Sequence, residues 1–101
     1  MKNTGSRIPP EFRLRVSRRI RTVMKPFVKE NESLTAECRE AATELGLYYM
    51  TVWFWYEGYT LPTIYNLVRF ADYYDVSIDY LLGRTAVKEL QRRGAVLEAV
   101  A

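Results

Sequence analysis

Proline and glycine divide this chain into short segments, and within these segments the apolar residues recur at spacings of three and four. That spacing is the period of an α-helix that buries one face, whereas a strand pair would show alternating apolar and polar residues. We therefore predict an all-α domain of five or six short helices. The residues that bound the segments are Pro9, Pro10, Pro26, Gly46, Gly58, Pro62, Gly83 and Gly94.

The first predicted helix opens at Pro9 and Pro10, because the fixed φ of proline is helical and the first N–H groups of a helix are unpaired. Pro26 should end or kink it near Lys25. Residues 29–33, KENES, are predicted to form a polar loop. The apolar stripe of this helix is Val16, Ile20, Val23, Met24 and Phe27.

The second predicted helix begins after the polar loop, where Ser33 or Thr35 can cap it. Gly46 follows the last apolar position and suits the left-handed residue that ends a helix. The apolar positions of this helix are Leu34, Cys38, Ala41, Ala42 and Leu45.

The third predicted helix lies in residues 47–58, LYYMTVWFWYEG, where we expect Val52 and Trp55 to face the core. The spacing of Ala42, Gly46 and Val52 fits a helix-turn-helix corner. In such a corner a small residue lets two helices approach, a glycine takes the turn and a branched apolar residue fills the angle.

The remaining chain predicts two short helices and an extension. Pro62 should open a fourth helix, and Ser77 should cap a fifth that ends at Gly83. Residues 85–93 are predicted to form a further helix, and Gly94 separates it from an apolar tail, AVLEAVA. The apolar positions of the fourth and fifth helices are Ile64, Leu67, Val68, Ala71, Tyr74, Ile78, Leu81 and Leu82.

Composition excludes several functions. The chain has 101 residues, no His and a single Cys, Cys38, so the commonest general base, the commonest metal ligand and any zinc site are missing. We expect no enzymatic activity, no metal and no cofactor. No apolar run approaches the roughly 18 residues of a membrane span, and MKNTGSRIPP lacks the apolar region of a signal peptide. We therefore expect a cytoplasmic protein without membrane contact.

Charge is distributed unevenly along the chain. Residues 1–29 contain nine basic groups and one acidic group, whereas residues 30–84 contain three basic and nine acidic groups. The arginines of the first helix are either a solvated face that pairs with the acidic body or a phosphate-binding surface. The acidic body alone is a poor docking surface for DNA, because phosphate contacts supply most of non-specific affinity.

A more specific pattern follows the third predicted helix. It consists of Trp55, Gly58 and Pro62, and then IYNLVRFADYYDVSIDYLLGR in residues 64–84. Over about residues 38–84 the chain resembles the lambda-repressor-like, or Cro/XRE-type, helix-turn-helix family. The resemblance implies a compact five-helix domain that binds operator duplex DNA as a homodimer, a type of regulator that phages and mobile elements often encode.

The resemblance also implies positions for DNA contact. Recognition of base edges normally uses Arg, Lys, Asn, Gln, Ser or Thr, so an aromatic recognition helix is unusual. The implied base-contacting residues are Tyr48, Tyr49, Met50, Trp53 and Phe54. We assign phosphate and backbone contacts to Arg13, Arg15, Arg18, Arg19, Arg21, Arg39, Thr51 and Tyr59.

Three uses of the aromatic surface remain open. It can contact thymine methyls and sugars in a DNA groove, stack on unpaired bases, or bind a protein. The protein-binding alternative would be an antirepressor or an inhibitor of a host defence nuclease.

We divide the chain into a basic arm (residues 1–9), a helix-turn-helix domain (residues 10–84, with the motif at about 35–57) and a C-terminal helix and tail (residues 85–101).

Overall fold

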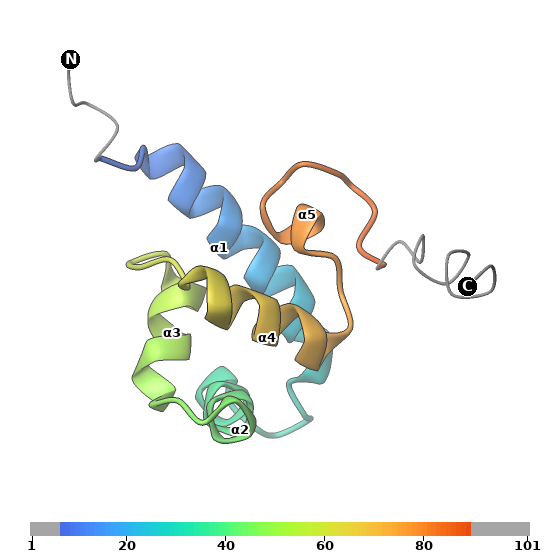
Figure 1. Ribbon diagram of the computed structural model, residues 1–101. Coiled ribbons are helices and arrows are strands. Elements are labelled where there is room, and N and C mark those ends of the chain that lie inside the picture. The colour runs from blue at the N-terminus through green and yellow to red at the C-terminus, as the bar shows by residue number, and fades with distance from the viewer. Residues whose placement is uncertain (1–6, 90–101) are drawn as a thin grey trace, which may run out of the picture.

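A computed structural model describes residues 7–89 and shows an all-α domain in which five α-helices and one 3-10 turn pack together (Figure 1). The elements are α1 (Pro10–Met24), η2 (Lys25–Phe27), α2 (Leu34–Leu45), α3 (Tyr49–Glu57), α4 (Ile64–Tyr74) and α5 (Ile78–Leu81). The predicted all-α class is confirmed. The first six residues of the predicted basic arm, the end of the predicted C-terminal helix and the apolar tail lie outside the described residues.

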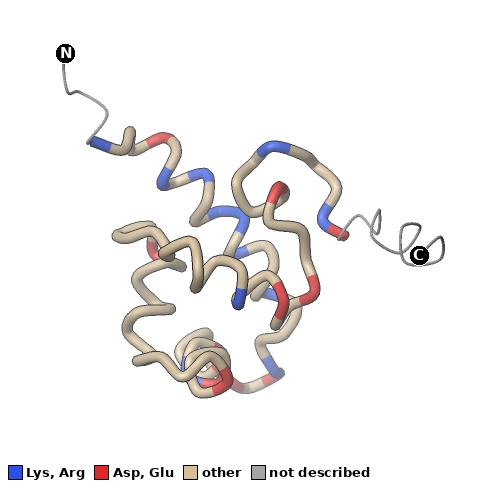
Figure 2. Tube along the Cα trace, in the orientation of Figure 1, with Lys and Arg blue, Asp and Glu red and all other residues tan. Residues whose placement is uncertain are grey.

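α1 is the longest helix and carries much of the positive charge. Lys and Arg recur along it, as Figure 2 shows. Its opposite face is apolar and packs on α3 and α5, while α2 packs on both α3 and α4. The core that results is built around fully buried side chains from four helices, Ile20, Met24, Cys38, Val52 and Phe70.

Most predicted helix ends are confirmed. The side chains of Ser33 and Ser77 cap α2 and α5, each accepting a hydrogen bond from an N–H three residues further on. Gly46 and Gly58 end α2 and α3 with φ of 69° and 87°, a left-handed conformation that glycine adopts without steric penalty. Pro26 lies in η2, directly after the end of α1.

Two predictions about α4 are wrong. The helix begins at Ile64 rather than at Pro62, because the Thr63 hydroxyl accepts a hydrogen bond from the Asn66 N–H and caps it. Ile64 is 83 % exposed and Val68 is 37 % exposed, whereas both were expected in the core. The predicted positions Leu67, Ala71 and Tyr74 are buried, and Phe70, which was not predicted, completes the buried face.

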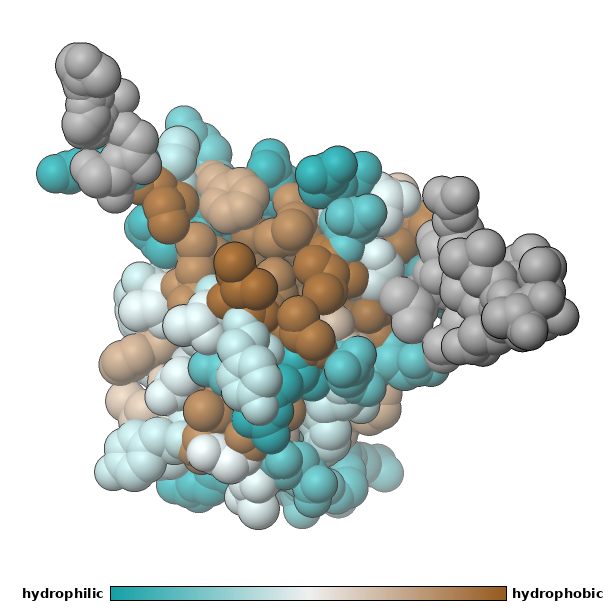
Figure 3. Space-filling model, in the orientation of Figure 1, coloured by the Kyte–Doolittle hydropathy of each residue, from teal (hydrophilic) through white to brown (hydrophobic). Residues whose placement is uncertain are grey.

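Ile64 and Val68 leave an apolar surface on α4. Figure 3 shows apolar side chains gathered at the centre of the face on which α1, α4 and α5 lie. Leu14 of α1 is also exposed, at 42 %. Contiguous exposed apolar surface of this kind is typical of a contact with another molecule.

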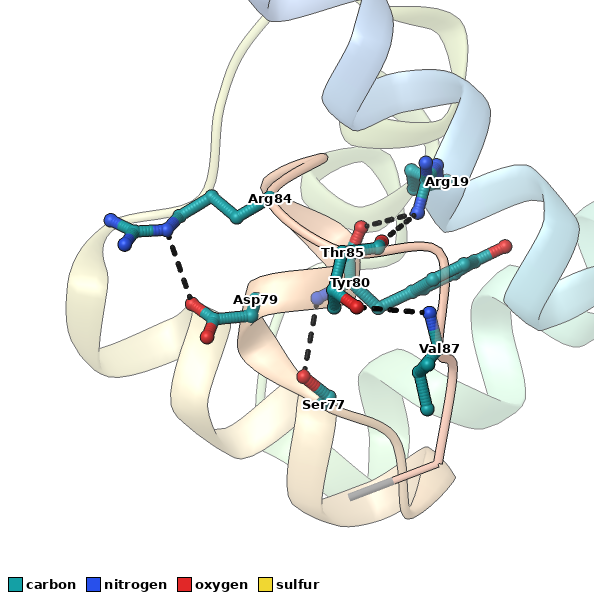
Figure 4. Close-up of polar contacts among 7 residues, drawn as sticks. All are labelled: Arg19, Ser77, Asp79, Tyr80, Arg84, Thr85 and Val87. Carbon is teal, nitrogen blue, oxygen red and sulfur yellow. Dashed lines mark hydrogen bonds and ion pairs between the residues drawn. The ribbon is translucent and has the colours of Figure 1, made fainter. Parts of the chain in front are cut away.

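The predicted helix over residues 85–93 is wrong for its described part, residues 85–89, which are not helical. Their backbone groups have other partners. The Thr85 carbonyl accepts a hydrogen bond from Arg19, and the Thr85 hydroxyl accepts one from the Val87 N–H (Figure 4). The Lys88 carbonyl accepts one from the Ser77 N–H, and an isolated antiparallel bridge joins Val76 and Glu89.

Candidate functional site

The candidate site is built on the corner between α2 and α3. The turn between them is short: Gly46 takes the left-handed position, and the Leu47 N–H donates to the Ala42 carbonyl over 2.8 Å. Val52 and Trp55 face the core from α3 and are 0 % and 2 % exposed, as predicted. The small side chain of Ala42 is also buried, which allows the close approach of the two helices.

The outward side of α3 carries a set of aromatic side chains. Phe54, Trp53 and Tyr59 form a triangle in which the three ring centroids lie 5.7–5.9 Å apart. Tyr48 precedes the helix and is 75 % exposed, and its ring lies 6.2 Å from that of Tyr49. We call this surface the aromatic face; it consists of Tyr48, Tyr49, Met50, Trp53, Phe54 and Tyr59.

The aromatic face is less exposed than its sequence suggested. Tyr49 and Trp53 are half-buried and pack against the core, and Met50 and Phe54 are also half-buried. Rings that are held in this way lose little conformational entropy when a ligand contacts them, so the face is preorganised.

A shallow hollow lies where the aromatic face meets α2. It has a volume of about 220 Å³ and is lined by Thr35, Tyr49, Met50 and Trp53. At its edge the exposed guanidinium of Arg39 lies over the Tyr49 ring, with Cζ 4.6 Å from the centroid. Arg39 therefore places a positive charge beside the aromatic face.

Two of the arginines predicted to contact phosphate, Arg13 and Arg21, bind carbonyls at the C-terminal end of α3. Arg13 Nε donates to the Gly58 carbonyl over 2.7 Å, and Arg21 donates to the Tyr56 carbonyl over 3.2 Å. Between them on the same side of α1, the buried Ser17 hydroxyl donates to Tyr56 O over 2.6 Å. These donors satisfy carbonyls that a helix end leaves without an intrahelical partner, and cations there also favour the helix dipole.

Arg19 binds the end of α5 in the same way. Its guanidinium donates to the carbonyls of Tyr80 and Thr85 over 3.0 and 2.9 Å and lies over the Tyr80 ring at 4.2 Å (Figure 4). Arg13, Arg19 and Arg21 are thus engaged within the molecule. Arg15 and Arg18 are exposed, and of the predicted α1 set they are the two without a carbonyl partner among residues 7–89.

The α1 cations do not pair with the acidic body. Among residues 7–89 the ion pairs are Lys29–Glu40 and Arg84–Asp79, and neither involves α1. Hydrogen bonds to carbonyls leave the positive charge of a guanidinium in place, so the α1 surface keeps an excess of positive charge.

The remaining predicted backbone-contacting residues lie on or next to α3. Thr51 is half-buried within the helix, and Tyr59 follows it and is 63 % exposed. Two residues that the sequence analysis did not select also border these surfaces. Thr35 lines the hollow beside α2, and Tyr56 lies beside Arg21 of α1. The sequence contained a signal for both, because Thr35 is one helical turn from the selected Arg39 and Tyr56 is one turn from the selected Trp53.

A buried polar pair lies beneath α2, away from the aromatic face. The Tyr74 hydroxyl donates to Glu37 Oε2 over 2.6 Å, and Glu37 is 6 % exposed. Burial raises the pKa of the Glu37 carboxyl, against the opposing effect of the Tyr74 hydrogen bond. Burial also raises the pKa of the adjacent Cys38 thiol to about 11, so this cysteine is not a reactive thiolate at neutral pH.

Further observations concern other kinds of site. Residues 7–89 contain no cluster of His, Cys, Asp and Glu able to hold a metal ion. In that same part of the chain, no helix has the length and apolar character needed to cross a bilayer. No family model, curated protein sequence or solved structure matches this chain.

Proposed function

We propose that this chain is a duplex-DNA-binding transcriptional regulator of the Cro/XRE type, in which α3 enters the major groove. The observation that carries the proposal is the arrangement of α2 and α3. They meet at a tight corner, α3 presents a preorganised outward face, and the exposed Arg39 lies beside it. A helix of nine residues is about 13 Å long, comparable with a major groove about 12 Å wide.

The aromatic face supports apolar contacts in the groove. Tyr49, Phe54 and Met50 offer surface to thymine methyl groups and to sugars, and the tyrosine hydroxyls offer hydrogen bonds. Specificity would therefore come from methyl positions and groove shape rather than from bidentate pairs to guanine or adenine.

Phosphate contacts are assigned to the cations that have no carbonyl partner. Arg15, Arg18 and Arg39 are exposed, and Tyr59 offers a hydroxyl next to α3. Each neutralised phosphate lowers the slope of log binding constant against log salt concentration by about 0.9, so three such cations per chain predict a slope of about −3.

Titration of a duplex of selected sequence over a salt series tests the proposal. Arg39→Ala should weaken binding and reduce the magnitude of the slope by about one unit. Arg84→Ala removes an equal charge on the far side of the fold, where Arg84 pairs with Asp79, and should leave the slope unchanged. Binding that is absent or independent of salt would reject the proposal.

A second candidate function is protein binding, as an antirepressor or a nuclease inhibitor. The observation that favours it is the absence of Lys, Arg, Asn and Gln from residues 46–61, which include all of α3. Aromatic side chains are common anchors at protein interfaces. A protein purified free of nucleic acid that captures one cellular protein, and loses it with Phe54→Ala, would support this function over DNA binding.

We further propose that the regulator acts as a homodimer in the cytoplasm. The side chains of Leu14, Ile64 and Val68 are apolar and exposed, and Figure 3 shows apolar side chains gathered on the face where α1, α4 and α5 lie. Equilibrium sedimentation of the full chain and of Ile64→Asp tests this assignment, since a charge in an apolar interface should shift the chain towards monomer.

A further inference from the structure

A second hollow lies where α1 meets Tyr56 of α3, and it has a different chemistry from the aromatic face. Its volume is about 360 Å³, within the usual range for small-molecule sites. It is lined by Arg18, Arg21, Thr22, Lys25 and Tyr56. Three of these five residues are cationic, and none is acidic.

The helical period brings the cations together. Positions 18, 21 and 25 are three and four residues apart and therefore lie on one side of α1. Tyr56 lines the hollow from α3, and its ring lies 5.6 Å from the Arg21 guanidinium.

Arg21 is fixed in place. It donates one hydrogen bond to the Tyr56 carbonyl, which leaves further guanidinium N–H groups for a ligand. A guanidinium that is already oriented loses less entropy when it binds an anion than a free side chain does.

Arg18 and Lys25 supply positive charge without an internal partner. Both are exposed, and neither belongs to the ion pairs formed among residues 7–89. Three like charges at one hollow repel one another, and an anion between them would relieve that repulsion. A carboxylate offers one negative charge, whereas a phosphoryl group offers up to two charges and three acceptor oxygens.

We propose that this hollow binds a phosphoryl group of an anion that carries at least two negative charges. Arg21 and Arg18 would donate to its oxygens, and Lys25 would act as a point charge. The site needs no residue of the aromatic face, so the proposal does not depend on DNA binding by α3. The phosphoryl group can belong to a free phosphorylated small molecule or to a nucleic-acid backbone.

Calorimetric titration of the full chain with inorganic tripolyphosphate at low ionic strength tests the proposal. We expect saturable binding that weakens about tenfold or more in the double variant Arg18→Ala, Lys25→Ala, since a hydrogen bond to a charged group is worth roughly one power of ten or more. The matched control is Arg7→Ala, Arg84→Ala, which removes two exposed cations outside the hollow and should change the affinity less than about twofold.

Two results would overturn the proposal: the absence of saturable binding to the native chain, or an equal loss of affinity in the control variant. Arg18 and Lys25 are exposed, so thermal melting should be unchanged in the double variant. The single variant Lys25→Glu provides a second test, because reversal of this charge should weaken binding more than Lys25→Gln does. Equal effects of these two substitutions would also contradict the site.

A second titration, with duplex DNA as competitor, distinguishes a free phosphorylated molecule from a nucleic-acid backbone as the source of the phosphoryl group. Competition between tripolyphosphate and duplex, with a smaller salt slope in the double variant, assigns the hollow to the nucleic-acid backbone. Tripolyphosphate binding that is unaffected by duplex, and is retained in Phe54→Ala, assigns it to a small phosphorylated ligand. Failure of DNA binding in every variant would reject the function proposed for α3 and leave this site intact.

Discussion

At the scale of single residues, the arginines of α1 divide into those that bind a backbone carbonyl and those that do not. Arg13, Arg19 and Arg21 bind carbonyls at the ends of α3 and α5. Arg15 and Arg18 stay exposed, although Arg15 lies against Gly83 beyond α5. The arginines of this helix therefore hold neighbouring helices as well as supply positive charge for a ligand.

Ser17 lies between Arg13 and Arg21 on the side of α1 that binds carbonyls at the end of α3. Its buried hydroxyl donates to the Tyr56 carbonyl, which also accepts from Arg21. Ser17→Ala should reduce the free energy of unfolding by about 1 kcal/mol, the usual value of one such hydrogen bond. Thr22→Ala is the control, because this exposed hydroxyl binds only the carbonyl of Arg18 in its own helix, and it should change the free energy by less than about 0.5 kcal/mol. Urea denaturation measures both, and equal effects would contradict the assignment.

Glu37 should make stability depend on pH. Burial raises its pKa in the folded state, so the folded chain holds this proton more tightly than the unfolded chain. Its contribution to stability therefore falls as the pH rises through and above the usual range of a glutamate. Glu37→Gln keeps an acceptor for the Tyr74 hydroxyl and has no charge, so its stability relative to the native chain should improve between about pH 4 and about pH 7. Thermal melting at several pH values measures this difference; a constant or opposite trend would contradict it.

At the scale of elements, the helix ends were largely predictable because their signals are local. Ser33, Ser77 and Gly46 act through their own backbone or that of the next turn, and a sequence displays such signals directly. Gly58 combines a local signal with a tertiary one. Its φ is 87°, and a Cβ there would lie 3.1 Å from Leu14 Cδ2 and 3.3 Å from Ser17 Oγ.

The two helix-ending glycines should respond differently to substitution. Gly46→Ala should cost about 1 kcal/mol, because it places an alanine in the left-handed region with no neighbour within 4 Å of the new Cβ. Gly58→Ala should cost more, about 2 kcal/mol or above, because the side chains of Leu14 and Ser17 on α1 must also shift to admit the methyl group. Urea denaturation of both variants measures the difference. An equal loss of stability would show that α1 is not held against the end of α3 as described.

Elements that depend on tertiary contacts were not predictable from their own residues. The apolar spacing of residues 85–89 favours a helix, but two of their carbonyls bind groups outside the segment. The Thr85 carbonyl accepts from Arg19, and the Lys88 carbonyl accepts from the Ser77 N–H. Ile64 and Val68 matched the predicted apolar stripe of α4 but lie at its exposed edge, and Phe70 is buried at the other edge. In the candidate site, the sequence could identify the aromatic positions of α3, but not that Arg13 and Arg21 would be engaged by its last carbonyls.

At the scale of the whole molecule, charge and apolar surface are separated. α1 carries unpaired positive charge, α3 presents the aromatic face, and α4 contributes exposed apolar side chains to the face seen in Figure 3. Such separation allows one small domain to hold a phosphate, contact a groove and self-associate through different surfaces. Substitutions on the aromatic face or on α4 leave the α1 cations in place, whereas Arg18 belongs both to the phosphate contacts proposed for DNA and to the hollow beside α1.

The central claim is that the aromatic face selects a DNA sequence. Selection of binders from a randomised duplex pool tests it most directly, with the native chain, Phe54→Ala and the control Tyr65→Ala compared. Tyr65 lies on α4 outside the aromatic face and is 70 % exposed. We predict that the native chain and Tyr65→Ala enrich the same thymine-containing sequence, and that Phe54→Ala loses or alters this preference while still melting as a folded protein. Enrichment of no sequence by the native chain, or of an unchanged sequence by Phe54→Ala, would contradict the account.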